Sequence, residues 1–337
     1  MLFSLFFFLF LSFSVTTTAS LSLSKRANFY KVFSYRILGG QEAHIDLFPF
    51  IAYIQIKVNE SQLQCSGSLI SPNTILTAAH CLIDEHKNTY SPSNITVGLG
   101  SKDNLKKNSN TFSVQKVIPH PNFDIYTAQN DIGIIILSEK VLPEIAIPTH
   151  IYNLNITEDL TVETAGWGYT SGNYSQGLSP TLQHTPVLIT EKNECSKNFF
   201  PWFGNNNSSI CTTNIPGNGA CYGDSGGPLI ASDILSRPLV GITSKFIVPG
   251  NNTDTRCGVK GQLVYYTNPS NYMPWIVNQT GISESDMLYN YNSLSSKETS
   301  TFTNYTSTLS PKSSSSLSLK SSYLLPLVLC IIDFILF

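Results

Sequence analysis

The chain has 337 residues, of which 42% are hydrophobic and 12% are charged, and its formal net charge is −2. The charged fraction is about half the usual share, and the apolar content is ample for the cores of one or two modest domains. Because charge is sparse and nearly balanced, there is no electrostatic basis for binding nucleic acid or an anionic membrane surface. Surface polarity comes instead from Asn, Ser and Thr.

The N-terminus has the features of a secretion signal. Residues 2–13 are almost continuously apolar, and Thr17-Thr18-Ala19 offers a small-residue cleavage site, although no basic n-region precedes them. We predict a signal peptide over residues 1–19 and an extracellular protein.

Two basic sites follow the signal. Lys25-Arg26 is a dibasic pair of the kind that kexin- or furin-like proteases cut, and a short stretch then ends at Arg36. Solvated surface charges are the alternative for both sites. The Ile-Leu-Gly-Gly that follows Arg36 favours processing there, so we predict a propeptide over residues 20–36.

The body of the chain has the periodicity of β-strands. In Ile54-Gln55-Ile56-Lys57-Val58 apolar and polar residues alternate, as in a half-buried strand. Residues 132–137 and 239–242 are short apolar runs that suit buried strands. Turn clusters at Ser71-Pro72-Asn73 and Ser91-Pro92-Ser93-Asn94 separate such segments. The sequence therefore predicts an all-β fold.

Three motifs supply a serine, a histidine and an aspartate. They are Thr77-Ala78-Ala79-His80-Cys81, Asn130-Asp131-Ile132-Gly133-Ile134 and Gly223-Asp224-Ser225-Gly226-Gly227-Pro228-Leu229. Alone, each has an ordinary structural explanation as a structural histidine, a turn or cap aspartate, and a glycine turn. Together they are what a catalytic triad assembled from distant loops requires.

The chemistry explains these residue types. The hydroxyl of Ser225 is a poor nucleophile near neutral pH, so it needs a base, and His80 titrates in the right range. Asp131 would orient the imidazole and stabilise its protonated form. The glycines around the serine would let the amides of Gly223 and Ser225 point at a developing oxyanion.

With these residues, the chain resembles the chymotrypsin-like (trypsin-fold) serine protease family, whose order of His, Asp and Ser it shares. The resemblance runs from Ile37 to about Gly281. It also includes Arg36-Ile37-Leu38-Gly39-Gly40, Cys65-Ser66-Gly67-Ser68-Leu69-Ile70, Gly166-Trp167-Gly168 and Tyr272-Met273-Pro274-Trp275-Ile276. It implies two six-stranded Greek-key β-barrels with the active site in the cleft between them. The barrels would divide near Thr149, giving segments 37–149 and 150–281, and residues 275–277 would belong to a short C-terminal helix.

The cysteines agree with an oxidising compartment. Six lie between Cys65 and Cys257, and the seventh, Cys330, is isolated near the C-terminus. Six cysteines allow 15 pairings, and sequence alone does not choose among them. The resemblance implies the pairs Cys65–Cys81, Cys195–Cys211 and Cys221–Cys257. Buried free thiols in a cytosolic protein are the alternative. The implied chemistry requires no cofactor and no metal.

The resemblance also implies a zymogen. Cleavage between Arg36 and Ile37 would free an α-ammonium that pairs with Asp224 and orders the oxyanion loop. An activating protease would therefore be a partner.

The expected substrate pocket departs from trypsin-like members, which carry an aspartate six residues before the nucleophile. This chain has Gly219 there. Phe246, two residues after Ser244, and Leu263, two before Tyr265, would fill a space that small residues usually leave open. We expect an apolar, shortened pocket that prefers small neutral residues at the cleavage point, as in elastase-like members.

Lys245 occupies a position where the family usually has an aromatic residue. It is either a solvated lysine or a charge at the lip of the pocket that attracts acidic substrate residues. If Gly219 rejects arginine, the enzyme cannot efficiently cut after Arg36 itself.

Nine Asn-x-Ser/Thr sequons favour glycosylation, although Asn206 and Asn207 overlap. They begin at Asn59, Asn94, Asn155, Asn173, Asn206, Asn207, Asn251, Asn278 and Asn304.

The C-terminal part changes character. Residues 282–322 are rich in Ser, Thr, Asn and Lys and predict an extended stalk. Residues 323–337 form an apolar tail, interrupted by Asp333, that is too short to span a bilayer as a helix. With Ser313 or a neighbouring serine as acceptor, this pattern predicts a glycosylphosphatidylinositol (GPI) attachment signal. A tail anchor or a merely hydrophobic end is the alternative.

The sequence thus predicts a monomeric, glycosylated serine endopeptidase acting on proteins or peptides, secreted or anchored at the cell surface. The competing hypothesis is a non-catalytic cell-surface glycoprotein that uses the same fold to bind a partner.

Overall fold

The computed structural model describes residues 39–170, 177–190, 193–198, 202–215, 217–250 and 256–290. The predicted signal peptide, Arg36 and Ile37, most of the stalk and the apolar tail lie outside the described residues. The chain divides into two units, Met1–Leu288 and Tyr289–Phe337. The fold and the site belong to the first unit.

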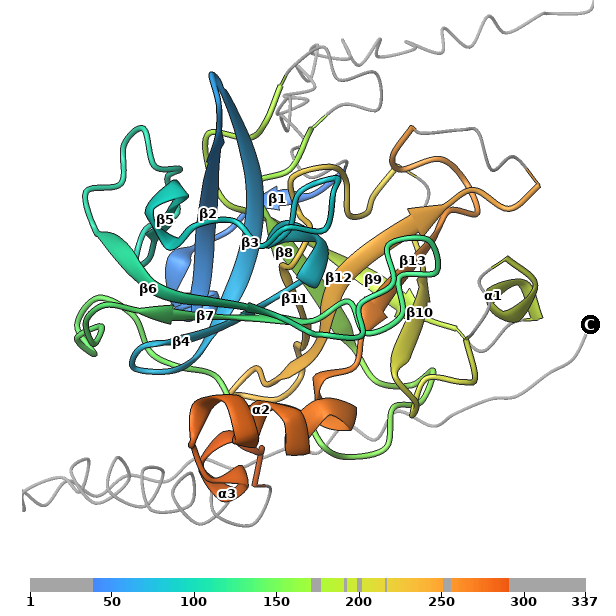
Figure 1. Cartoon of the computed structure of the whole chain (residues 1–337). Helices are drawn as coiled ribbons and strands as arrows, with labels where there is room; N and C mark the ends of the chain where they lie inside the picture. Colours follow the sequence, from blue (N-terminus) through green and yellow to red (C-terminus); the bar gives the residue numbers. More distant parts are fainter. Residues whose placement is uncertain are drawn as a thin grey trace, which may run out of the picture. The chain divides into compact units, whose positions relative to one another are not determined.

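Six antiparallel strands close the first barrel, in the order β2-β3-β4-β7-β6-β5 (Figure 1). The strands are β2 (Ile51–Val58), β3 (Ser61–Ser71), β4 (Thr74–Thr77), β5 (Ile95–Gly98), β6 (Thr111–Pro119) and β7 (Gly133–Leu137). Strand β5 returns beside β2, which gives the Greek-key order.

The second barrel repeats this arrangement with the strands of the C-terminal half. They are β8 (Val162–Gly166), β9 (Gln183–Ile189), β10 (Ser209–Thr213), β11 (Pro228–Ala231), β12 (Leu239–Ile247) and β13 (Leu263–Thr267). They pair in the order β8-β9-β10-β13-β12-β11, and β11 pairs with β8 to close the ring. The short strand β1 (Gln41–Glu42) is added to β9. The predicted all-β fold of two six-stranded barrels is confirmed.

The remaining elements are short helices. They are η1 (Ile45–Leu47), η2 (Ala79–Cys81), η3 (Pro92–Asn94), α1 (Asn193–Asn198), η4 (Pro269–Tyr272), α2 (Met273–Thr280) and α3 (Glu284–Met287). Helix α2 contains the predicted C-terminal helix segment and ends at Gly281, which has the left-handed φ of 71° typical of a helix C-terminus. Within the described residues no helix is long and apolar enough to cross a membrane.

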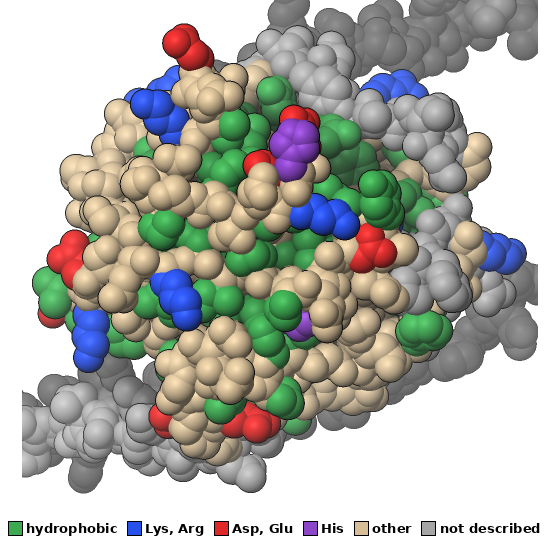
Figure 2. Space-filling model, viewed as in Figure 1, with side chains coloured by type: hydrophobic (Ala, Val, Ile, Leu, Met, Phe, Trp, Pro, Cys, Tyr) green, Lys and Arg blue, Asp and Glu red, His purple; other side chains and the backbone are tan. Residues whose placement is uncertain are grey.

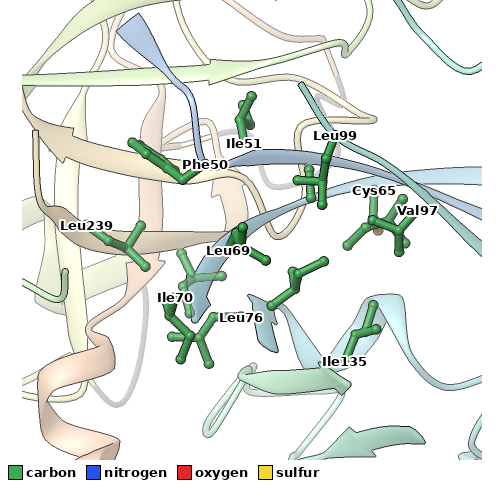
Figure 3. Close-up of a cluster of buried hydrophobic side chains, with 14 of the residues drawn as sticks. Phe50, Ile51, Cys65, Leu69, Ile70, Leu76, Val97, Leu99, Ile135 and Leu239 are labelled. Atoms are coloured by element: carbon green, nitrogen blue, oxygen red, sulfur yellow. The ribbon is translucent and has the colours of Figure 1, made fainter. Parts of the chain in front are cut away.

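The sequence patterns locate the strands correctly. The alternating run 54–58 lies in β2, and the apolar runs 132–137 and 239–242 coincide with β7 and the start of β12. Apolar side chains of the first barrel converge in its interior, among them Leu69, Leu76 and Ile135, and Leu239 of β12 joins the same cluster (Figure 3). The barrels therefore share a continuous core, which fixes the strand ends that carry the site.

The folded unit extends beyond the boundary expected at Gly281. Residues 284–287 form α3, Met287 is fully buried, and its carbonyl accepts a hydrogen bond from Ile151 N at 2.7 Å. The prediction that a stalk begins at residue 282 is therefore wrong at its start, because Met287 is buried and Ile282 and Leu288 pack against the core.

The visible surface matches the composition. Figure 2 shows a face covered mainly by hydrophobic and uncharged polar side chains, with charged side chains scattered among them. On such a face the charged side chains do not form a large patch of positive or negative potential.

Candidate active site

The three motif residues lie at strand ends of both barrels. His80 is in η2, directly after β4, and Asp131 lies just before β7. Ser225 precedes β11 of the second barrel. Ser66 N of β3 donates a hydrogen bond of 2.8 Å to Ser225 O, which ties the serine loop to the first barrel.

His80 and Asp131 form a tightly held pair. His80 Nδ1 lies 2.8 Å from Asp131 Oδ2, and His80 N donates to Asp131 Oδ1 at 3.0 Å. Ser244 Oγ also donates to Asp131 Oδ2, at 2.6 Å. Asp131 is 1% exposed, so its charge depends on these donors in place of water. The imidazole is thereby fixed in the orientation that leaves Nε2 for proton transfer.

The electrostatics of the pair follow from this geometry. Burial alone would lower the pKa of His80, but the charge of Asp131 and its hydrogen bond raise it above the ordinary value. Burial would raise the pKa of Asp131, but the charge and hydrogen bond of His80, together with Ser244, lower it. The pair is therefore built to carry a carboxylate beside an imidazole that can accept a proton.

A strained residue positions Asp131. Asn130 has a φ of 57°, in the left-handed region. Its Nδ2 donates to Asn122 O at 2.9 Å, and its Oδ1 accepts from Tyr272 Oη at 3.2 Å. Thr267 Oγ1 adds a bond of 2.8 Å to Asp131 O. These contacts from two barrels and η4 hold the aspartate in place despite the local strain.

The serine loop requires glycine. Gly226 has a φ of 76°, and a Cβ there would collide with Thr77 Oγ1 and Ser66 O. Gly223 has a φ of 96°. Within the described residues, neither Gly223 N nor Ser225 N has a hydrogen-bond acceptor, whereas Asp224 N and Gly226 N do. Two amides that flank the serine are thus available to an incoming oxygen.

A cavity of about 360 Å³ lies beside Ser225. Its lining residues are His80, Phe123, Ile125, Ala128, Asp131, Ala220, Cys221, Tyr222, Ser225, Thr243, Ser244, Lys245, Phe246 and Val264. Among the described residues no hydrogen bond joins His80 to Ser225 Oγ. Such bonds are often long in unliganded enzymes and shorten when substrate binds.

A second cavity, of about 320 Å³, meets the first at His80, Tyr222 and Ser225. Gly223 lies in its wall, together with Gln64, whose Nε2 donates to Gly223 O at 3.3 Å. The two cavities on either side of the serine form a track that suits an extended chain.

The pocket residues expected from sequence are only partly correct. Ser244, Lys245 and Phe246 line the cavity, but Leu263 does not. Leu263 packs in a separate cluster with Cys195, Cys211 and Tyr265. Successive side chains of a strand alternate between faces, and Val264 is the residue of β13 that lines the cavity. The expectation was off by one position.

Gly219 also lies outside the cavity lining. It has a φ of 137°, and a Cβ there would lie 3.3 Å from the Cβ of Asn214. Two lining side chains, Tyr222 and Val264, were not expected from the sequence, whereas Phe246 was. Tyr222 and Phe246 touch across the cavity with ring centroids 5.2 Å apart, and Val264 is the cross-strand partner of Phe246.

Lys245 lies half-buried in the same cavity wall. Burial lowers its pKa to about 8, against the opposing effect of the Asp131 charge. The segment before Asp131 adds the apolar side chains Phe123 and Ile125. In the sequence, the only indication that Phe123 and Ile125 line the cavity is that they are apolar and lie a few residues before Asp131.

Asp224 points away from the cavity into the protein. Its Oδ1 accepts from Gly168 N at 2.7 Å, and its Oδ2 accepts from Cys221 N at 2.9 Å. Burial raises the pKa of Asp224 to about 7, although both hydrogen bonds act to lower it. Within the described residues no cation pairs with this carboxyl group.

The disulfides are those that the resemblance implied, namely Cys65–Cys81, Cys195–Cys211 and Cys221–Cys257. The first holds the helical turn that carries His80, and the third braces the serine loop. The sulfurs of Cys65 and Cys81 lie near the imidazole of His80, but they are bonded to each other and offer no thiolate for a metal.

Two six-stranded barrels that bring a histidine, a buried aspartate and a serine to one cavity define a protein of the serine protease class. The profile of the Trypsin family matches residues 37–276. The chain belongs to the trypsin family and is a serine endopeptidase.

Individual relatives agree. The chain is 29% identical over 278 residues to a collagenase of Hypoderma lineatum, covering 81% of this chain and 98% of the relative. It is 30% identical over 274 residues to CLIP domain-containing serine protease B8 of Anopheles gambiae, covering 73% of this chain but only 66% of that longer protein. The solved structure of HL collagenase matches with a TM-score of 0.60 and 28% identity, over 73% of this chain and all of that one.

Proposed function

We propose that this serine endopeptidase is a secreted zymogen that cleaves proteins or peptides after small neutral residues, through an acyl-enzyme on Ser225. The observation that carries the proposal is the Asp131–His80 pair at 2.8 Å, facing the cavity that Ser225 lines. The reaction needs a base of this kind, because a serine hydroxyl is not nucleophilic enough by itself.

Each step has a group in place. His80 Nε2 takes the proton of Ser225 Oγ as the oxygen attacks the substrate carbonyl, and Asp131 stabilises the imidazolium. The amides of Gly223 and Ser225, which have no acceptor among the residues that the structure describes, bind the oxyanion. His80 then protonates the leaving amine, and water releases the acyl group by the reverse sequence.

Small residues at the cleaved position follow from the cavity walls. Phe246 and Val264 face each other across neighbouring strands, and Tyr222 touches Phe246 over the space between. Among the described lining residues the one acidic side chain is Asp131, which already accepts from His80 and Ser244. A substrate arginine or lysine would therefore find no free acid there, and an unpaired charge is costly to bury. A small neutral side chain is the best fit.

Activation depends on Asp224. Its carboxyl group is 1% exposed and held by two backbone amides, so a buried cation would stabilise its charged form. Cleavage after Arg36 would supply the α-ammonium of Ile37. We expect Ile37→Gly and Asp224→Asn to abolish activity without unfolding the chain. Because the pocket rejects arginine, a separate protease must make the cut.

The location rests on the chain ends, which lie outside the described residues. A signal peptide over residues 1–19, the sequons and the GPI-type tail support a glycoprotein that is secreted and then tethered at the cell surface. Release of the protein from intact cells by a phosphatidylinositol-specific phospholipase tests the anchor. Retention on the cells would favour a tail anchor.

A non-catalytic binding protein is the competing proposal, favoured only by the aromatic contact that narrows the cavity. The two are separated by a fluorophosphonate probe, which reacts with an activated serine. Labelling of Ser225 after controlled cleavage at Arg36 supports the protease. A correctly cleaved and folded chain that stays unlabelled supports the binding protein.

A further inference from the structure

A closed set of contacts surrounds the strained residue that precedes Asp131. Asn130 Oδ1 accepts a hydrogen bond of 3.2 Å from Tyr272 Oη, and Asn130 Nδ2 donates to Asn122 O at 2.9 Å. Asn122 N in turn donates to His120 Nδ1 at 3.2 Å. This bond requires an unprotonated Nδ1, and burial lowers the pKa of His120, which favours the neutral ring. The rings of His120 and Tyr272 meet edge-on with centroids 5.6 Å apart, so the contacts return to their starting point.

The backbone at Asp131 forms a tight turn that the same residues hold. Ile132 N donates to Asn130 O at 2.8 Å, across Asp131. His120 N donates to Ile132 O at 2.9 Å. The turn that presents the carboxylate to His80 is therefore fixed on one side by the conformation of Asn130 and on the other by His120.

The C-terminal helices brace this turn. Tyr272 ends η4, and Trp275 lies in the following helix α2. The ring of His120, which directly follows β6, also contacts Trp275, with centroids 4.8 Å apart. Burial raises the pKa of Tyr272 to about 12, so its hydroxyl remains a donor at every pH at which His80 can act as a base. Ser208 bonds to the same hydroxyl, whose one proton goes to Asn130.

Asn130 needs this support because its φ of 57° lies in the left-handed region. A residue with a side chain adopts that conformation at a cost in free energy, and it stays there only when its surroundings hold it. If the bond from Tyr272 is lost, part of the molecules should relax to another φ. The peptide before Asp131 then rotates, and the carboxylate loses its alignment with His80 Nδ1.

We propose that Tyr272 is a positioning residue for catalysis, which acts on Asp131 through Asn130. This inference rests on the proposed role of His80 as the base. A misaligned carboxylate orients the imidazole less well and stabilises its protonated form less. Tyr272 is not among the described residues that line the two cavities beside Ser225. Its loss should therefore affect kcat more than KM.

The first test removes the hydroxyl alone. Tyr272→Phe keeps the ring against His120, and it is measured on the full chain after cleavage at Arg36, with active enzyme titrated by a fluorophosphonate. We expect kcat to fall about 10-fold, which corresponds to about 1.4 kcal/mol, with KM nearly unchanged. Asp131 raises the pKa of His80, so the limit on kcat/KM at acidic pH should move to lower pH in this variant.

Tyr152→Phe is the matched control. It also removes the hydroxyl of a buried tyrosine, which donates to Asn155 O at 3.4 Å, but the backbone of Tyr152 pairs with Leu239 at the start of β12. Its kcat and its pH limit should equal those of wild type. A wild-type kcat in Tyr272→Phe, or an equal loss in Tyr152→Phe, overturns the proposal.

Two substitutions of Asn130 test the strain without altering Tyr272. Glycine adopts a positive φ at no steric cost, whereas alanine keeps that cost and lacks both side-chain hydrogen bonds. Asn130→Ala should therefore have a lower kcat than Asn130→Gly, although glycine removes more atoms. In the Asn130→Gly background, Tyr272→Phe should have no further effect. Equal rates for the alanine and glycine variants, or an undiminished effect of Tyr272→Phe, overturns the proposal.

The wild-type enzyme separates this inference from the proposed function. Cleaved, folded wild type that does not label at Ser225 would overturn the proposed function. Wild type that labels, together with a Tyr272→Phe variant that labels and turns over at the same rate, would overturn the positioning role alone.

Discussion

Ser244 Oγ donates a hydrogen bond of 2.6 Å to Asp131 Oδ2, the same oxygen that lies 2.8 Å from His80 Nδ1. Ser244 belongs to the second barrel, whereas His80 and Asp131 belong to the first. The bond therefore joins β12 to the His80–Asp131 pair across the boundary between the barrels. It keeps Asp131 charged and oriented while leaving the other side of the imidazole open to Ser225.

Replacing Asp131 with asparagine should lower kcat by about 10⁴-fold, as expected when the imidazole loses its orienting carboxylate. The pH dependence should change as well. The neutral imidazole is the active base, and Asp131 raises the pKa of His80, so wild-type kcat/KM should fall below a pH higher than the ordinary 6.5. In Asp131→Asn this limit should move to lower pH. A shift to higher pH would contradict the assigned roles.

The pocket walls predict a change of specificity. Phe246→Gly and Val264→Gly each remove a side chain from the cavity beside Ser225, so cleavage should extend to large apolar residues such as Phe and Leu. Leu263→Val is the matched control, since Leu263 packs on the opposite face of β13, and its cleavage profile should equal that of wild type. Profiles are read from a peptide library. Wild-type cleavage dominated by Arg or Lys would refute this account of the pocket.

Asp224 should make the uncut chain sensitive to pH. Burial raises its pKa from 3.8 to about 7, so between these values the native state binds a proton that the unfolded state has released. The free energy of unfolding should then decrease as pH rises, by at most about 1.4 kcal/mol per pH unit. Asp224→Asn lacks this contribution.

Urea unfolding at several pH values between 4 and 7 measures the difference between wild type and Asp224→Asn. After cleavage at Arg36, pairing with the new ammonium of Ile37 should lower the pKa of Asp224 and remove most of the difference. An identical difference before and after cleavage would mean that the ammonium does not reach this carboxylate.

The sequons should differ in occupancy. Asn206 Nδ2 donates to Ile156 O at 3.2 Å, and its Oδ1 accepts from Ile156 N at 2.8 Å. A glycan on this nitrogen would break the pair, so chains modified there should fold poorly. Asn59, Asn94 and Asn278 are exposed and should carry glycans. Enzymatic deglycosylation followed by mass spectrometry reads each site, and full occupancy of Asn206 would contradict this expectation.

The barrels and the three motif residues were both assigned from local signals, and the structure confirms the barrels and brings the three residues to one cavity. Glycine is needed at Gly226 for steric reasons, and the strands have short apolar runs. The register of β13 was less secure. The pocket residue was expected two positions before a tyrosine of this strand. Because Tyr265 and Tyr266 are adjacent, taking Tyr265 as the reference points to Leu263, and taking Tyr266 points to Val264. Only the pairing of β13 with β12 decides which of the two faces the cavity.

Two other features depend on contacts between distant segments. The meeting of Tyr222 with Phe246 arises from the placement of the serine loop against β12, and no local pattern reports it. The docking of α3 depends on a few apolar residues in a polar segment, namely the buried Met287 and the partly buried Ile282 and Leu288. Residues 282–322 are polar on average, which hides these few apolar residues, and composition therefore predicts a stalk for the whole segment.

The central claim is that His80, Asp131 and Ser225 act as one catalytic unit. The most direct measurement is the rate of fluorophosphonate labelling of the full chain, with the modified residue located by mass spectrometry, before and after cleavage at Arg36. The account predicts labelling of Ser225 that is strong after cleavage, weak before it, and lost in His80→Ala. Cleaved, folded protein that does not label at Ser225, or labels equally without His80, would contradict it.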